Sequence, residues 1–132
     1  MLSGYSAALL LDADCAPRRD VPAEVTVPGG GQRPRPGLVV RRDRIAPGET
    51  CLVGDARCTS PLRSAYDLGR RGDFVDRVVA VDRLANRHRF HPDLLLIFAV
   101  HYRGERGTDL ICETLAHTCC YAGSPMESAR VR

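Results

Sequence analysis

Arginines gather in one part of the chain in a pattern that could bind phosphate groups. Five of them lie within a dozen residues, offset only by Asp43, and they are Arg33, Arg35, Arg41, Arg42 and Arg44. A guanidinium can bind a phosphate through two parallel hydrogen bonds, and such binding weakens as salt is added. The same cluster could instead protect an edge strand against pairing with another chain, or contact a protein partner. No aromatic residue lies between Gln32 and Ser60, so the stretch lacks the stacking platform typical of single-strand binders.

Other reactive residue types are not spaced for catalysis or for a bound metal. The histidines form no metal-binding or nucleophile-elbow motif, and they are His88, His91, His101 and His117. The run 29–31 of glycines lacks the lysine and the helix of a phosphate-binding loop, so it indicates a turn. Asp73, Asp76 and Asp82 lie at helical spacing beside arginines, which is typical of a solvated helix face. We therefore expect no enzyme, no cofactor and no metal site.

The cysteines predict free thiols instead of a disulfide framework. They form no CxxC pair and two are adjacent in sequence; they are Cys15, Cys51, Cys58, Cys112, Cys119 and Cys120. Buried thiols are the simplest interpretation, and a zinc site built from distant residues or a set of reactive thiols remains open. The N-terminal residues lack a secretory signal, and no apolar run reaches the length of a membrane span. We therefore expect a cytoplasmic protein that does not enter a membrane.

Composition favours one ordinary globular domain. The chain has 132 residues, of which 44% are hydrophobic and 27% charged, enough for a sizeable single core. All 19 basic residues are arginines, and with 16 acidic residues the formal net charge is only +3. The whole chain is thus not an electrostatic binder of nucleic acid, and such a role would need local clustering of charge.

A small sheet is expected to position the arginine cluster. Four β-rich runs predict strands, over residues 23–27, 37–42, 49–53 and 56–59. Glycines and prolines over 28–36 predict a flexible loop between the first two strands, and Gly54-Asp55 predicts a turn between the last two. Short connections of this kind favour a mostly antiparallel sheet.

Helical signals dominate the rest of the chain. A short helix is predicted over 6–11, before the strands. After them, Ser60-Pro61 is typical of a helix start, and the apolar face of this helix is expected to hold Leu62, Ala65, Tyr66 and Gly69. Three more helices are expected to begin at Asp73, His91 and Thr108. Strands followed by helices predict an α+β fold, with a small, mostly antiparallel sheet followed by about four helices.

The last residues carry the signals of another helix start. Ser124 is a typical N-cap, Pro125 suits the first helical position, and Glu127 lies three residues after the cap. Because a final segment seldom opens a new helix, residues 122–132 are expected to be the truncated first helix of a further domain, following an α+β domain over 1–121. Glu127 could also simply complete a capping box with Ser124.

Five stretches, in order, resemble a large bacterial family, the AbiEi-type antitoxins of type IV toxin–antitoxin systems, many of which continue into a Vsr-like endonuclease domain. They are GYSAAL (4–9), EVTVP (24–28), VVRRDR (39–44) with Pro47, TSPLRSAYDLGRR (59–71) and SPMES (124–128). In that family a winged-helix domain precedes this region and the nuclease-like domain follows it. The resemblance therefore implies that residues 1–121 are the middle domain.

The resemblance also implies a function. Glu127 is the only residue of the nuclease-like motif that carries over, and one carboxylate cannot hold a catalytic metal ion. We therefore expect a non-catalytic regulatory or interaction module that binds a cognate toxin or another protein, or that assists binding to duplex DNA through the arginine cluster. The alternative is an inactive remnant of a Vsr-like endonuclease.

Overall fold

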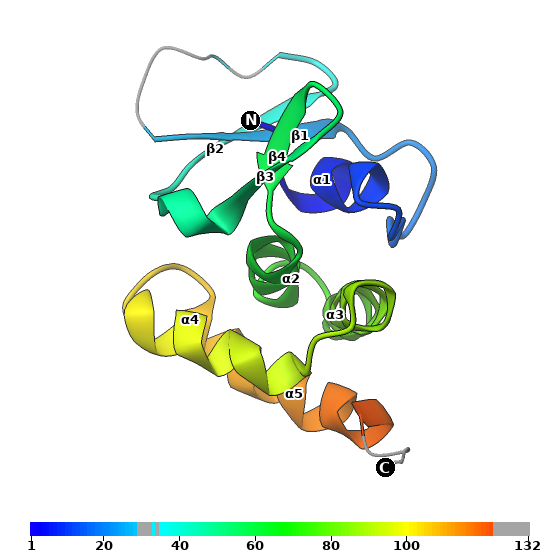
Figure 1. Cartoon of the computed structure of the whole chain (residues 1–132), viewed down its shortest axis with the longest axis vertical. Coiled ribbons are helices and arrows are strands. Elements are labelled where there is room, and N and C mark those ends of the chain that lie inside the picture. The colour runs from blue at the N-terminus through cyan, green and yellow to red at the C-terminus, as the bar shows by residue number, and fades with distance from the viewer. Residues whose placement is uncertain (29–32, 34, 123–132) are drawn as a thin grey trace.

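The chain separates its strands from most of its helices (Figure 1). In the computed structural model, which describes residues 1–28, 33 and 35–122, the strands lie at one end with helix α1 (Gly4–Leu10) beside them. Helices α2 to α5 extend from there to the other end. The predicted α+β class is therefore confirmed, including four α-helices after the strands.

Two strand pairs make up the β part of the described chain. The strands are β1 (Ala23–Val27), β2 (Leu38–Arg42), β3 (Thr50–Val53) and β4 (Ala56–Thr59). Strands β3 and β4 form the predicted antiparallel hairpin, but β1 and β2 pair in parallel, so the expected antiparallel arrangement does not extend to them. Parallel pairing needs the chain to return to the end where β1 starts before it enters β2, which a tight hairpin turn cannot do.

The backbone of Leu2 joins the two strand pairs. Its N–H donates to the carbonyl of Arg57 at 3.1 Å, and its carbonyl accepts from the N–H of Thr59 at 3.0 Å, both on β4. On its other side Leu2 forms an antiparallel bridge with Val25 of β1. The sequence did not predict this connection, because so short an extended segment has no alternating pattern.

Helix α2 (Pro61–Gly69) lies at the centre of the molecule. The Ser60 hydroxyl accepts from the N–H of Arg63 at 3.1 Å, and Pro61 is the first helical residue, as predicted. Helices α1, α3, α4 and α5 all contact α2. Every residue from Arg63 to Gly69 is buried as a result, so the helix has no solvated face along this stretch.

The remaining helices begin where the sequence predicted. They are α3 (Phe74–His88), α4 (Leu95–His101), which follows the 3-10 turn η2 (Pro92–Leu94), and α5 (Thr108–Ala122). Asp73 and His91 are the N-cap residues of α3 and η2. The single helix expected after His91 is therefore divided into a 3-10 turn and a short α-helix.

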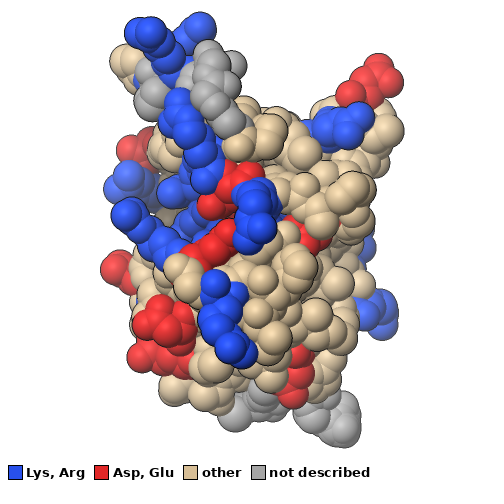
Figure 2. Space-filling model, turned by 90° about the vertical axis from the view of Figure 1, so that its left-hand side faces the viewer, with Lys and Arg blue, Asp and Glu red and all other residues tan. Residues whose placement is uncertain are grey.

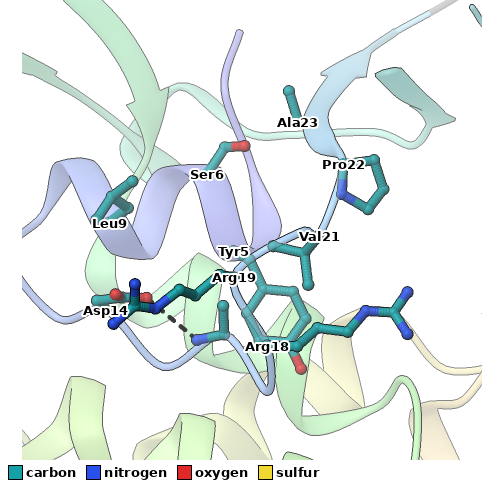
Figure 3. A pocket seen from close by; sticks show the side chains of 10 residues that line it. Tyr5, Ser6, Leu9, Asp14, Arg18, Arg19, Val21, Pro22 and Ala23 are labelled. Carbon is teal, nitrogen blue, oxygen red and sulfur yellow. Dashed lines mark hydrogen bonds between the residues drawn. The ribbon is translucent and has the colours of Figure 1, made fainter. Parts of the chain in front are cut away.

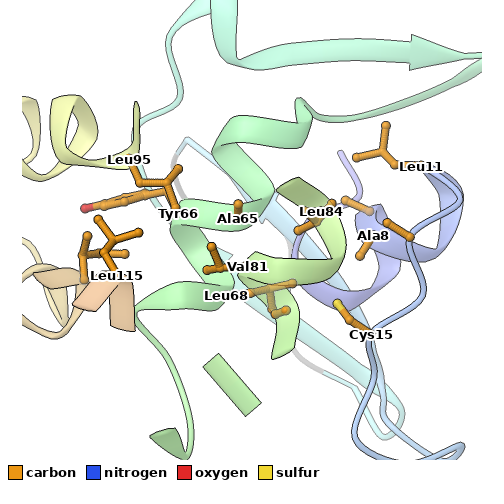
Figure 4. Packing of buried hydrophobic residues seen from close by; sticks show 14 of the residues in the cluster. Ala8, Leu11, Cys15, Ala65, Tyr66, Leu68, Val81, Leu84, Leu95 and Leu115 are labelled. Carbon is orange, nitrogen blue, oxygen red and sulfur yellow. The ribbon is translucent and has the colours of Figure 1, made fainter. Parts of the chain in front are cut away.

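The apolar core surrounds α2 and continues to α1 on one side and α5 on the other (Figure 4). Tyr66 and Ala65 of α2 are completely buried, as are Val81 and Leu84 of α3. A Cβ atom on Gly69 would lie 2.9 Å from a methyl group of Val81, so the glycine allows the close approach of α2 and α3.

Two further expectations concern the domain division and the membrane. The second part of the predicted domain division, with Glu127, lies outside the described residues apart from Ala122, the last residue of α5. No helix in the described part of the chain is long and apolar enough to cross a membrane.

Asp82 on α3 is half-buried, and burial raises its pKa from 3.8 to about 6. Since the folded protein then holds a proton that the unfolded chain has released, its stability should fall as the pH rises from about 4 to about 6. Replacing Asp82 by Asn should remove this fall and raise the free energy of unfolding at pH 7 by about 1 kcal/mol, a value reduced for the partial exposure of the carboxyl. Urea unfolding at several pH values measures the difference, which should vanish below pH 4; equal stability of the two proteins at pH 7 would contradict it.

Candidate anion-binding site

A buried ion pair lies within α2. The side chains of Arg63 and Asp67 are fully buried one helical turn apart, and Nε of Arg63 donates to both carboxylate oxygens of Asp67 at 3.1 and 3.2 Å. Nη1 of Arg63 donates to Glu49 Oε1 and to the carbonyl of Arg44, each at 3.0 Å. Burial alone lowers the pKa of Arg63, but Asp67 and Glu49 more than offset this and raise it. The guanidinium therefore stays charged inside the protein.

Two tyrosines enclose this pair from the helical side. The hydroxyl of Tyr102 donates to Glu49 at 2.7 Å, and its ring lies 4.9 Å from the Arg63 guanidinium. Burial, together with Glu49, raises the pKa of Tyr102 to about 12, so its hydroxyl remains a donor at neutral pH. Tyr66 stacks on Tyr102 with ring centres 5.7 Å apart, and its hydroxyl hydrogen-bonds the hydroxyl of Thr108 at 2.8 Å.

Asp43 links the end of β2 to the end of α2. Nη2 of Arg71 lies 2.8 Å from Asp43 Oδ2, and Nη2 of Arg70 lies 3.3 Å from the same oxygen and 2.9 Å from Asp67 Oδ1. Three arginines thus share the carboxylate of Asp43, since Nη2 of Arg63 also lies 3.9 Å from it, and Arg70 also shares the carboxylate of Asp67 with Arg63. Positive charge is therefore only partly neutralised at this end of the helix.

The loop after α4 completes the arrangement. Nη1 of Arg70 donates to the carbonyl of Arg106 at 2.8 Å, which places Arg106 beside the end of α2. Gly107 has a positive φ of 79°, and a Cβ atom there would collide with the carbonyl of Arg70. A glycine at this position thus allows the loop to approach α2.

These elements surround a pocket of about 320 Å³ whose lining is mostly arginine, although Glu24, Asp67 and Glu105 pair with some of these side chains from outside the lining. Five arginines and one carboxylate line it together with Val40, and they are Arg41, Arg42, Asp43, Arg70, Arg71 and Arg106. Burial lowers the pKa of Arg71, and the like charges of Arg41 and Arg70 add to this effect while Asp67 and Asp43 oppose it. Nε of Arg70 and Nη1 of Arg71 are buried and donate to no described residue. Both features favour a bound anion.

The pocket lies on the side of the molecule where β2 and α4 are seen in Figure 1. Figure 2 shows this side, where basic side chains gather over the upper half of the surface with acidic groups between them. The surface is therefore a mixture of charges with a local basic region.

Only part of the predicted arginine cluster lines this pocket. Arg41 and Arg42 do, although Nε of Arg41 also donates to Glu24 at 3.1 Å. Arg44 points elsewhere, with Nη2 3.8 Å from Glu105 and its guanidinium over the ring of Tyr102. The remaining two, Arg33 and Arg35, are exposed and do not line the pocket.

Sequence reasoning missed three residues of the pocket. Arg70 and Arg71 follow the helix predicted from Ser60-Pro61, and Arg106 precedes the helix predicted from Thr108, so none of the three adjoins the arginine cluster in sequence. Two adjacent arginines at the end of a helix were the available sign of a basic site. Their position in the sequence, however, does not indicate that they lie beside β2.

Two of the histidines make hydrogen bonds that hold local structure. His88 hydrogen-bonds the carbonyl of Leu11 at 2.8 Å, and His91 is the N-cap of η2, where its side chain accepts from the N–H of Asp93. Among the described residues, no group of three or more His, Cys, Asp or Glu side chains is arranged to hold a metal ion.

A second hollow, of about 350 Å³, lies between α1 and the segment that leads to β1 (Figure 3). Its lining includes Tyr5, Arg18 and Arg19, but Arg18 forms an exposed ion pair with Asp20 at 3.0 Å. Burial raises the pKa of Tyr5 to about 12, so its phenol is not ionised at neutral pH. This hollow therefore lacks the excess charge of the arginine pocket.

No model of a known protein family matches the chain, and neither the curated proteins nor the solved structures gave a significant match. The resemblance to AbiEi-type antitoxins therefore stays a prediction.

Replacing Asp67 by Ala should destabilise the fold strongly, because it leaves the buried charges of Arg63 and Arg70 without a shared partner. Breaking a buried ion pair costs about 3–5 kcal/mol. Asp20, whose ion pair is exposed, provides the matched control, and its replacement by Ala should cost less than about 1 kcal/mol. Urea unfolding of both variants measures the difference, and similar values for the two would show that the α2 pair is not a structural requirement.

Proposed function

We propose that this protein is a non-catalytic interaction module that binds the phosphate backbone of duplex nucleic acid through its arginine pocket. The observation that carries the proposal is a pocket with five arginines and a single carboxylate, Asp43. Guanidinium groups suit phosphate because their donors match two of its oxygens at once. No aromatic side chain lines the pocket, which favours a duplex backbone over stacked single-stranded bases.

The pocket combines fixed and exposed arginines. Arg70 and Arg71 are held by Asp67 and Asp43, so they lose little freedom when an anion binds. Arg42 and Arg106 are exposed at the rim, where they can approach a phosphate from solvent. The buried guanidinium groups then fix the position of a bound phosphate, and the exposed guanidinium groups add positive charge that attracts it.

Further contacts can come from the rest of the predicted cluster. Arg33 and Arg35 are exposed on the segment before β2, and the side chain of Arg44 is 78% exposed just after it. Phosphate contacts of this kind position a protein on a duplex but carry no base sequence. We therefore expect weak binding with little sequence preference.

This role agrees with the regulatory module that the antitoxin resemblance implies, acting in the cytoplasm on DNA or beside a cognate toxin. The alternative, an inactive remnant of a Vsr-like endonuclease, depends on Glu127, which lies outside the described residues. An inactive remnant would have no DNA affinity that depends on the arginine pocket. The binding experiment described next therefore distinguishes the remnant from the interaction module.

The experiment replaces Arg42 and Arg106 together by Gln, because both are exposed and the backbone carbonyl of Arg106 that Arg70 uses is retained. Affinity for a fluorescent DNA duplex should fall at least tenfold at low salt. The slope of log affinity against log salt should decrease by about 2, since each lost phosphate contact removes about 0.9. Fluorescence anisotropy over a salt series measures both quantities.

The matched control replaces Arg18 and Arg19 by Gln, which removes the same charge from the other hollow. It should retain most of the affinity and most of the salt dependence. Equal losses in the two double variants would show that only net charge matters, and an unaltered chain without affinity for DNA would refute the proposal.

A further inference from the structure

Two cysteines face each other across the β3–β4 hairpin. Cys51 and Cys58 are register partners, and their sulfur atoms are 3.6 Å apart. Residues directly opposite in an antiparallel pair have Cα atoms about 4.5–5.5 Å apart, within the range of about 4.4–6.8 Å that a disulfide requires. The sulfurs need to approach by about 1.5 Å to reach bonding distance, which small side-chain rotations can provide.

The two thiols differ in access. Cys58 is completely buried, whereas Cys51 is partly exposed. Burial raises the pKa of Cys58 to about 12, and its hydrogen bond with Cys51 adds to this effect. A reagent from solvent therefore meets Cys51 first, and Cys58 is placed to react with whatever Cys51 carries.

Of the other cysteines with described side chains, neither offers this arrangement. Cys15 is buried in the apolar core, and Cys112 is exposed on α5. Neither forms a sulfur contact like that between Cys51 and Cys58. The hairpin pair is thus distinguished by geometry.

We propose that Cys51 and Cys58 form a reversible dithiol–disulfide site that is oxidised by a small disulfide of the glutathione class. The thiolate of Cys51 attacks one sulfur of oxidised glutathione and releases one glutathione thiolate. Cys58, which loses its proton only as it reacts, then attacks the Cys51 sulfur of this mixed disulfide and releases the second. The protein loses two electrons to glutathione, and the two thiol protons pass to the released thiolates.

This site is independent of the arginine pocket and of the proposed binding of nucleic acid. The disulfide would join β3 to β4 just before Thr59, whose hydroxyl hydrogen-bonds Ser64 of α2 at 2.7 Å. Oxidation would thus cross-link the hairpin that leads directly into the central helix.

The test treats the reduced full-length chain with oxidised glutathione, quenches it with an alkylating reagent and maps the peptides by mass spectrometry. The expected product is a bond between Cys51 and Cys58, with the loss of two hydrogen atoms and no bound glutathione. Dithiothreitol should restore both thiols.

Three variants sharpen the result. Cys58→Ala should accumulate a stable glutathione adduct on Cys51, and Cys51→Ser should slow the oxidation of Cys58 at least tenfold. Cys112→Ser is the control and should form the hairpin disulfide at the rate of the unaltered chain. The proposal is overturned if the unaltered chain also accumulates the Cys51 adduct, or if Cys51 and Cys58 are not joined while other cysteines are oxidised.

Discussion

Burial of the Arg63 guanidinium is the constraint on which the fold depends. A desolvated charge costs several kcal/mol unless opposite charges and hydrogen-bond acceptors surround it. Asp67 supplies one acceptor from the same helix, Glu49 another from the turn before β3, and the carbonyl of Arg44 a third from the segment after β2. Because Tyr102 also holds Glu49, the strands and the helical end are joined through a polar centre as well as an apolar core.

The local elements were largely predictable because their signals are local. The cap at Ser60-Pro61, the turn at Gly54-Asp55 and the β-branched strands all depend on neighbours in sequence. The parallel pairing of β1 with β2 and the bridge at Leu2 depend on contacts across the chain, which periodicity does not encode. The environment of α2 was missed for the same reason, because Arg63 and Asp67 resemble residues of a solvated helix face until other helices enclose them.

The candidate site was only half predictable. Counting arginines along the sequence found Arg41 and Arg42, which lie on one strand. It also included Arg44, whose side chain turns toward Glu105 and Tyr102, away from the pocket. Arg70 and Arg106 come from a helix end and a loop that meet only in the fold, so sequence proximity could not connect them with β2.

Enclosure of the central helix α2 limits which substitutions the sequence can accept there. An apolar position can usually exchange one side chain for another of similar volume. Arg63 and Asp67 are costly to change singly, since either exchange removes one charge from a buried set that also holds Glu49 and Arg70. Their effects on stability are therefore expected to be non-additive. Substitutions that keep the free energy of unfolding unchanged must therefore replace the buried charged residues together. We expect the polar centre to be either retained whole or replaced whole by apolar side chains.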